Sequence, residues 1–318
     1  MESMENGFGD IKMLKINKRK VNEKCFILAL AAYPLLHFGI FWVYVNSSTI
    51  ISTFMRYSVR TNSLIFCGFE NYVKVFKKIF MGEDPALGRA FLNSFQAIGI
   101  NLVIFPIALF SSYAFYKNMP GTKVYSVMFY VPQLISIVVL AMAFRYMFYS
   151  DFGPVSLLMA KIMGVDKVDL ISTSSNFLWP VIWLFCIWSG LGSNVILIRG
   201  AMLRIPKEVV ESAILDGCGF FRELWSITIP LCMSTISVYI VSMSMSATSF
   251  TMAPMLIAKS AGAMGRFMTY SWFIFENAST TNPGTIISVT TMGVFFTIVN
   301  LPLMIAARVL TKKFTPEY

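Results

Sequence analysis

The sequence predicts an all-α membrane protein with six transmembrane helices and both termini in the cytoplasm. Of its 318 residues, 56% are hydrophobic and only 13% are charged, whereas about a quarter of the residues in a soluble domain are charged. The apolar residues also gather in runs of about twenty or more, the length that crosses the hydrocarbon core of a bilayer. We expect the spans at about residues 26–45, 91–116, 125–148, 177–198, 231–257 and 286–307.

The first 24 residues are polar and basic, and we expect them to form a cytoplasmic tail before a single six-span domain, residues 25–318. The first span is longer than the apolar region of a cleaved signal peptide, so we expect it to be retained. More than half of the 26 Lys and Arg residues fall on the side of the membrane that carries this tail. We therefore expect the chain to lie in the cell membrane with that side in the cytoplasm. The net charge of +10 is therefore expected to meet lipid headgroups and not nucleic acid.

The loop between the first two spans, residues 46–89, contains a predicted amphipathic helix. Lys74, Lys77 and Lys78 lie opposite an apolar stripe, as on a helix that lies in the membrane interface. The stripe consists of Tyr72, Val75, Phe76, Ile79 and Phe80. Residues 149–176 form a second outer loop. Because a proline lies within each of the six spans, we expect kinked helices around a pathway.

The stretch between the fourth and fifth spans, residues 204–230, is too polar to lie in lipid. Pro206 suits the first turn of a helix, where its missing N–H costs nothing. On that helix one face carries Val210, Ala213, Ile214 and Gly217, and the other carries Lys207, Glu208, Glu211 and Ser212. Asp216-Gly217 predicts a sharp bend. A second amphipathic turn follows, with Phe221, Leu224, Trp225 and Thr228 on one face. The pattern fits either a docking element or a surface helix that only connects two spans.

This stretch resembles the EAA motif of the membrane subunits of ABC importers that work with solute-binding proteins. The resemblance is carried by Glu211-Ser212-Ala213, Asp216-Gly217, Phe220-Phe221, Ile227 and Ile229-Pro230. Ser212 replaces the usual alanine, Cys218 stands where a small alanine is usual, and the second proline expected after Pro230 is missing. The resemblance implies a coupling helix that seats in a groove on a cytoplasmic ATPase. Its implied coupling residues are Glu208, Glu211, Ser212, Ala213, Asp216, Gly217, Phe220, Phe221 and Pro230.

A second phrase, Gly68-Phe69-Glu70-Asn71-Tyr72 followed by Val75-Phe76, resembles the larger-type permease subunits of sugar importers. The resemblance implies the type I ABC importer permease fold and a sugar or oligosaccharide as cargo. It also implies a second, different permease subunit, two ATPase subunits inside and a solute-binding protein outside. ATP and magnesium would then be bound by the ATPase, and this chain would bind no cofactor. Ser260-Ala261-Gly262 stands where the family has Gly-Gly-Pro near its outer gate, which leaves the cargo open.

Neutral polar residues in the later spans are candidates for the substrate pathway. Ser242, Ser246 and Ser249 recur at i, i+4 and i+7 in the fifth span, so they share a helix face. Asn194 in the fourth span and Asn300 in the sixth add amides. Such groups can hydrogen-bond a neutral polar solute such as a sugar. Equally, Ser and Thr in spans bond the carbonyls of their own helix or mediate helix packing.

The sequence offers little for competing functions. There is no phosphate-binding loop, no metal-ligand pattern and no nucleophile paired with a base, so we do not expect an enzyme. The five cysteines are scattered without a CxxC pair. The main alternative is a self-contained secondary transporter of a small polar solute, and a membrane enzyme or assembly scaffold comes third. The lack of an acidic residue in the middle of any span disfavours a proton- or sodium-coupled carrier.

Overall fold

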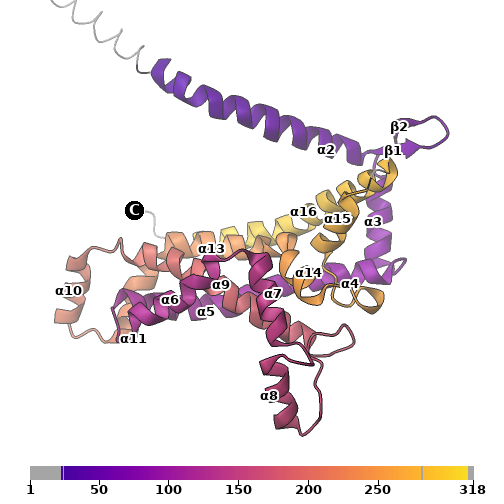
Figure 1. The fold of residues 1–318 in the computed structure, drawn as a ribbon. Coiled ribbons are helices and arrows are strands. Elements are labelled where there is room, and N and C mark those ends of the chain that lie inside the picture. Colours follow the sequence, from indigo (N-terminus) through magenta and orange to yellow (C-terminus); the bar gives the residue numbers. More distant parts are fainter. Residues whose placement is uncertain (1–22, 24, 281, 314–318) are drawn as a thin grey trace, which may run out of the picture. The chain divides into compact units, whose positions relative to one another are not determined.

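The computed structural model describes residues 23, 25–280 and 282–313. The predicted cytoplasmic tail therefore lies outside the described residues, apart from Glu23. The chain divides into two compact units, residues 1–68 and residues 69–318. Figure 1 shows that the described part is mostly helical.

The first unit contains one long apolar helix and a β-hairpin. The helix runs over Cys25–Thr53 and includes the π-helical segment η1 (Phe38–Tyr44) and α2 (Val45–Thr53). It continues beyond the predicted end at residue 45. Polar side chains after that point bond to carbonyls of the preceding turn, as Thr49 Oγ1 does to the Val45 carbonyl at 2.8 Å. This satisfies their donors without interrupting the helix.

The β-hairpin follows directly and was not predicted. Strands β1 (Met55–Ser58) and β2 (Ser63–Phe66) pair antiparallel, with Met55 opposite Phe66. Asn62 adopts a positive φ of 50° just before β2, a conformation that asparagine tolerates better than most residues. The segment that we expected to be an irregular polar loop is therefore partly a sheet.

The second unit opens with the predicted amphipathic helix. Helix α3 (Glu70–Phe80) buries Val75 and Ile79, and Lys74 and Lys77 are exposed on its surface. Sequence periodicity located this helix correctly, because its apolar residues recur at helical spacing.

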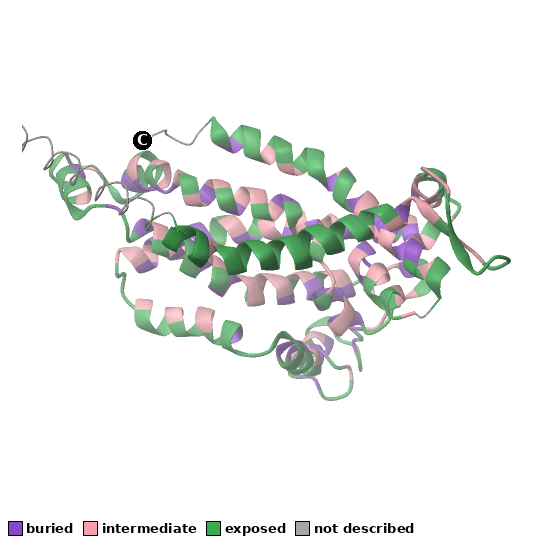
Figure 2. Cartoon of the chain, turned by 90° about the horizontal axis from the view of Figure 1, so that it is seen from above, coloured by how far each residue is buried: buried purple, intermediate pink, exposed green. Residues whose placement is uncertain are grey.

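Three long apolar helices follow in this unit. The second predicted span is made of α4 (Pro85–Ser94) and α5 (Gln96–Tyr116), which together form a 32-residue apolar segment. The fourth is α9 (Leu178–Met202) and the sixth is α16 (Pro283–Lys312). The most apolar windows of α4–α5 and α9 are each 39% buried, against 11% for α16. Helices α5 and α9 therefore form the centre of the unit, and each helix also carries an exposed face (Figure 2).

The third predicted span is broken. Helices α6 (Thr122–Leu134) and α7 (Ile137–Met147) meet at an angle of 111°. Ile135 and Ser136 between them are extended. Pro132 lacks the N–H that the helical ladder needs, so it weakens the last turn of α6. The two helices cover the predicted third span, residues 125–148, and the break follows the proline that we expected to kink it.

The fifth predicted span is also interrupted. Helix α13 (Met233–Met245) passes into the 3₁₀ turn η3 (Ser246–Ser249), the helical path stops at Phe250, and α14 (Met252–Ala258) begins beyond it. Thr269 Oγ1 donates to the Phe250 carbonyl, which the break leaves without a helical partner. Irregular backbone at membrane depth needs such substitute bonds.

Helix α8 (Pro154–Met163) lies within the predicted outer loop, residues 149–176, and α15 (Tyr270–Ala278) lies between the fifth and sixth predicted spans. Within the described residues, four helices are long and apolar enough to cross a membrane, or up to six when each bent pair is one span. The described chain therefore agrees with the predicted helical membrane class.

Candidate functional site

The polar stretch between the fourth and fifth predicted spans folds as two short helices with a bend between them. Helix α10 (Lys207–Leu215) starts one residue after Pro206, which caps it instead of entering its first turn. Asp216 caps the helix, and the next residue, Gly217, has a φ of +72°. The Gly217 N–H donates to the Ile214 carbonyl at 3.0 Å, and the Cys218 N–H donates to the Ala213 carbonyl at 2.9 Å. These two bonds form a Schellman motif, which needs a left-handed residue at the position of Gly217.

The second half of the stretch runs as a chain of short helical segments. These are α11 (Phe220–Glu223), the π-helical turn η2 (Leu224–Thr228) and α12 (Ile229–Leu231). The predicted order of helix, bend and helix is thus confirmed. Pro230 lies in α12. The segment Phe220–Leu231 meets the next helical segment, Met233–Ser249, at a bend of 77°.

Most of α10 is exposed. Ala213 is its one buried residue, while Val210 is half-buried. Ile214 was expected on the same inward face, but 56% of it is exposed, and Leu215 is 88% exposed. We use the name docking surface for the exposed residues Glu208, Glu211, Ser212, Ile214, Leu215, Asp216 and Phe221. It combines carboxylates with large apolar side chains, a mixture that proteins reserve for partner contacts when apolar groups are contiguous.

The second short helix faces the protein more closely. Leu224 and Thr228 are buried, at 0% and 1% exposure, whereas Trp225 is 58% exposed. Phe221 is also exposed, at 66%. The prediction that Phe221, Leu224, Trp225 and Thr228 share one face was therefore wrong, since η2 is wound as a π-helix in which the spacing differs. Phe220 contacts Tyr113 of α5, with 4.6 Å between the ring centroids.

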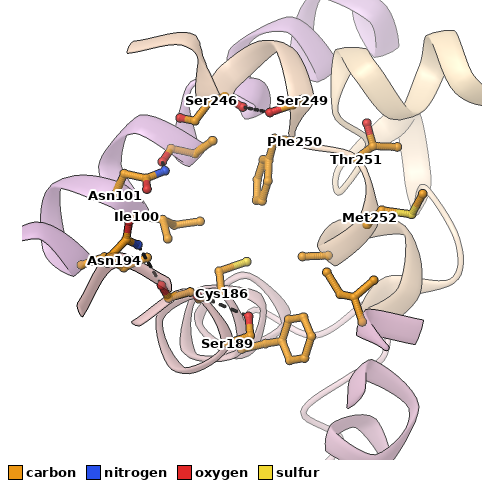
Figure 3. Close-up of a pocket in the computed structure, with 16 residues that line it drawn as sticks. Ile100, Asn101, Cys186, Ser189, Asn194, Ser246, Ser249, Phe250, Thr251 and Met252 are labelled. Atoms are coloured by element: carbon orange, nitrogen blue, oxygen red, sulfur yellow. Dashed lines mark hydrogen bonds between the residues drawn. The ribbon is translucent and has the colours of Figure 1, made fainter. Parts of the chain in front are cut away.

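A cavity of about 420 Å³ lies between α5, α7, α9 and the broken end of the fifth span. Figure 3 shows Asn101 and Asn194 across this cavity from Thr251 and Met252, with the ring of Phe250 between the two sides. Three of the predicted pathway residues line the cavity: Asn194, Ser246 and Ser249. Both breaks border it too, through Ile137 and Phe250.

The lining of the cavity is mostly apolar, includes uncharged polar side chains and carries no Lys, Arg, His, Asp or Glu. Asn194 Nδ2 donates to the Gly190 carbonyl at 2.8 Å, and Ser246 Oγ donates to the Met243 carbonyl at 2.7 Å. In these bonds the Asn194 amide nitrogen and the Ser246 hydroxyl act as donors, so the side-chain oxygens of both residues remain able to accept hydrogen bonds. Such oxygens can accept hydrogen bonds from hydroxyl groups of a neutral ligand.

Ser242 and Asn300 do not line this cavity. Ser242 lies one helical turn before Ser246 and lines a separate cavity with Met304 and Arg308 of α16. Asn300 is 4% exposed, and its Nδ2 donates to the Ser244 carbonyl at 3.1 Å. This bond joins α16 to α13, so Asn300 serves helix packing in this structure.

Sequence reasoning missed two polar residues of the cavity, Asn101 and Ser189. Thr251 also lines it, and the resemblance to sugar permeases implies that Phe250-Thr251 lies in a substrate-gate region. Asn101 lies on α5 and Ser189 on α9, and each is a single polar residue among apolar neighbours. A helical wheel for either span would have marked them. Thr251 follows the break at Phe250, and no local pattern indicates where that break occurs.

Comparisons with known proteins agree with this arrangement. Residues 104–316 match the family model described as "Binding-protein-dependent transport system inner membrane component". Protein LplB of Bacillus subtilis (strain 168) is 26% identical over 250 residues, which cover 76% of this chain and 75% of that protein. The "Multiple sugar-binding transport system permease protein MsmF" of Streptococcus mutans is 22% identical over 241 residues, covering 73% of this chain and 78% of that protein.

Solved structures extend the likeness to the fold. One is the crystal structure of a bacterial ABC transporter involved in the import of the acidic polysaccharide alginate. A chain of it superposes with a TM-score of 0.75 at 20% identity, covering 94% of this chain and 99% of its own length. The bacterial alginate ABC transporter in complex with an alginate pentasaccharide-bound periplasmic protein superposes with a TM-score of 0.73 at 18% identity, covering 93% and 97%. At these identities the likeness establishes the fold alone.

Proposed function

The chain belongs to the family of binding-protein-dependent transport system inner membrane components, and on this premise we propose that it is the membrane-spanning subunit of an ATP-driven importer for a sugar or oligosaccharide. The observation that carries the proposal is the family match over residues 104–316. Three further features support it: the exposed bent helix, the cavity with uncharged polar groups in its lining, and the sugar transport named for a relative.

We propose six spans, with each bent pair crossing the membrane once. The N-terminal apolar helix, α4–α5, α9 and α16 supply four of them. The other two are α6 with α7, and the segment from α12 to the break at Phe250. An even number of spans puts both termini on one side, and the basic N-terminal tail favours the cytoplasm. Residues 25–318 then form one permease domain.

The cavity is proposed as this chain's half of the translocation pathway. Its asparagine and serine oxygens accept hydrogen bonds from sugar hydroxyls, and Ile100, Phe185 and Phe250 offer apolar surface for the faces of sugar rings. A carboxylate on the cargo would carry a negative charge into the cavity, and the lining has no cationic side chain to pair with it. The cargo is therefore proposed to be uncharged where it contacts this chain.

The docking surface is proposed to seat on a cytoplasmic ATPase, to which ATP and magnesium bind. Glu208, Glu211 and Asp216 offer carboxylates, while Leu215 and Phe221 offer apolar anchors for a groove. Closing of two ATPase subunits would pull on α10. The bend at Gly217 passes this pull to α11 and on to the spans, which switches the cavity between inward-facing and outward-facing states. No catalytic step is assigned to this chain.

The remaining partners follow from the same proposal. A second permease subunit completes the pathway, as the resemblance to sugar importers implies. The resemblance near Asn71 favours a heterodimer. A solute-binding protein delivers the cargo outside, in line with the periplasmic protein in the complex of the similar alginate transporter.

One observation favours the alternative of a self-contained secondary transporter. Two broken helices meet at the cavity, an arrangement that such carriers use to bind substrate and coupling ions. The two functions differ in their energy source, so one experiment separates them. The complex is purified with its partners and reconstituted in proteoliposomes. ATP is supplied on the ATPase side, and a mixture of neutral oligosaccharides is supplied on the other side together with the solute-binding protein.

Uptake that requires ATP and persists when a protonophore dissipates the proton gradient supports the importer. Uptake by the single chain without ATP, abolished by the protonophore, contradicts it. Replacing the neutral mixture by oligosaccharides of uronic acids tests the cavity chemistry separately, and we expect little or no uptake of these.

A further inference from the structure

A buried ion pair fastens the bent helix to the membrane-spanning part of the protein. Lys117 Nζ lies 2.6 Å from Glu223 Oε1. The Glu223 side chain is 3% exposed and that of Lys117 is 22% exposed. Glu223 is the last residue of α11, and Lys117 caps the C-terminal end of α5. The pair therefore joins two elements that are more than a hundred residues apart in the sequence.

A second contact lies beside the ion pair. The Tyr113 hydroxyl donates to the Phe220 carbonyl at 3.1 Å, and the Tyr113 ring is 0% exposed. Lys117 Nζ lies 6.0 Å from the centroid of that same ring. Both ends of α11 are thus held by the last turn of α5. Among its nine residues, α10 has only Ala213 buried, so the two halves of the bent helix differ in how firmly they are held.

The physics of a buried pair makes this contact a rigid joint. Two opposite charges out of water attract strongly at short distance, and separating them leaves a charge without solvent or partner. A small slide of α11 along α5 would therefore be opposed much more than a slide of one apolar surface over another. Buried ionic groups are best known for fixing register in this way.

Helix α5 carries the joint to the cavity. It is one element from Gln96 to Tyr116, and Ile100, Asn101 and Ile104 of the same helix line the cavity. A displacement of α11 relative to the membrane would thus move the wall of the cavity through Lys117 and α5. Without the pair, α11 could shift while α5 stayed in place.

We propose that Lys117 and Glu223 are positioning residues that transmit movement of the docking surface to the cavity wall through α5. This inference rests on the proposed function, since it requires an ATPase that moves the docking surface. The pair is not part of the docking surface itself, because both side chains are turned into the protein. Losing the ion pair should therefore leave ATPase binding intact but stop movement of the docking surface from reaching the cavity wall.

The test measures movement and ATPase binding in the same complex. The reporter is a single cysteine at the cavity, Ser249→Cys, in a chain whose five native cysteines are replaced by alanine or serine. Its rate of labelling by a water-soluble maleimide is measured in the purified complex, without nucleotide and with a non-hydrolysable ATP analogue and magnesium. The variants are Glu223→Gln, Lys117→Gln and the exchange Lys117→Glu with Glu223→Lys. The matched control is Asp151→Asn, which removes an exposed ion pair with Lys167 of similar length, 2.8 Å.

With the native pair we expect the nucleotide to change the labelling rate by about tenfold, within the usual range for coupled sites. Each single variant should keep its ATPase but lose most of this change. The exchanged pair should restore at least part of it, and Asp151→Asn should behave like the native chain. Restoration by the exchange separates a positioning role from a general loss of folding.

A full nucleotide response in both single variants would overturn the inference, as would an exchange variant that behaves like the single ones. A native complex that holds its ATPase but shows no nucleotide response at Ser249→Cys would overturn it too, and leave the importer proposal standing. A native chain that binds no ATPase contradicts the proposed function itself, and the inference falls with it.

Discussion

Replacing Gly217 by alanine should weaken the attachment of the ATPase, because the bend of the docking element depends on this residue's backbone. Gly217 has a φ of +72° and closes α10 through the Schellman hydrogen bonds of its own N–H and that of Cys218. A Cβ at this position would meet no atom within 4 Å. The effect of the substitution therefore comes from the backbone conformation and not from a clash.

The magnitude follows from the left-handed conformation. Holding an L-residue there costs about 1–2 kcal/mol compared with glycine. Because 1.4 kcal/mol corresponds to a factor of ten, the bent state should become about 5- to 30-fold less favourable relative to other conformations of the loop. If only the bent state fits the ATPase groove, the apparent affinity falls by the same factor.

Gly219 provides a matched control two residues along the same loop. It is also exposed and also has no atom within 4 Å of a Cβ, but its φ is −77°. Gly219→Ala should therefore bind the ATPase as the native chain does, and Gly217→Asn should lie between, since asparagine tolerates the left-handed region.

The assay is titration of the detergent-purified permease complex with the isolated ATPase, with the thermal midpoint of the permease as a control for folding. We expect the midpoint to change little, since α10 contributes one buried side chain. Equal ATPase affinity of Gly217→Ala and Gly219→Ala would refute the idea that the bend is required.

Four other substitutions test three separate parts of the molecule. Glu211→Lys reverses a charge on the docking surface, so the recovery of the ATPase in a pulldown should fall about tenfold or more. The free energy of unfolding should change by no more than about 0.5 kcal/mol, because the residue is exposed. Unchanged recovery would remove Glu211 from the docking surface. Gly192→Ala places a Cβ 2.2 Å from the Phe129 carbonyl oxygen, and we expect about 1–3 kcal/mol of destabilisation in thermal unfolding. Gly190→Ala meets only a side-chain methyl of Ile104 at 3.1 Å and should cost less, so the reverse order would contradict the helix packing. Ser249→Leu fills part of the cavity, and overpacking of about 1–3 kcal/mol should reduce ATP-driven uptake about tenfold. ATPase binding should stay intact. Normal uptake would place the pathway elsewhere.

The sequence predicted the class of the protein and the position of most helices, since both depend on apolar length and periodicity. Helix α9 begins within one residue of its predicted start at residue 177, and α3 follows its apolar stripe. The bend at Gly217 was predictable because glycine after an aspartate at the end of a helical face is a local signal.

The breaks at Ser136 and Phe250 were not predictable in the same way. A hydropathy window averages over about 19 residues, so it does not register a break that affects only two or three of them. What permits the break at Phe250 is a hydrogen bond from Thr269, nineteen residues away, and this is a tertiary contact. The same limit applies to the cavity, because Ser242 and Ser246 are close on the helix but face different neighbours.

The hairpin over residues 55–66 was overlooked although signals were present. Tyr57, Leu64 and Ile65 favour strands, and Asn62 favours a turn.

The central claim is that this chain works as the permease of an ATPase-driven complex, and purification of the tagged protein in mild detergent tests it most directly. The associated chains would be identified by mass. We predict that a second six-span subunit and an ATPase with a phosphate-binding loop copurify with the native chain, and that the ATPase is lost when Glu211 and Asp216 are both replaced by lysine. A single chain that purifies alone and still transports solute in liposomes without ATP would contradict the claim.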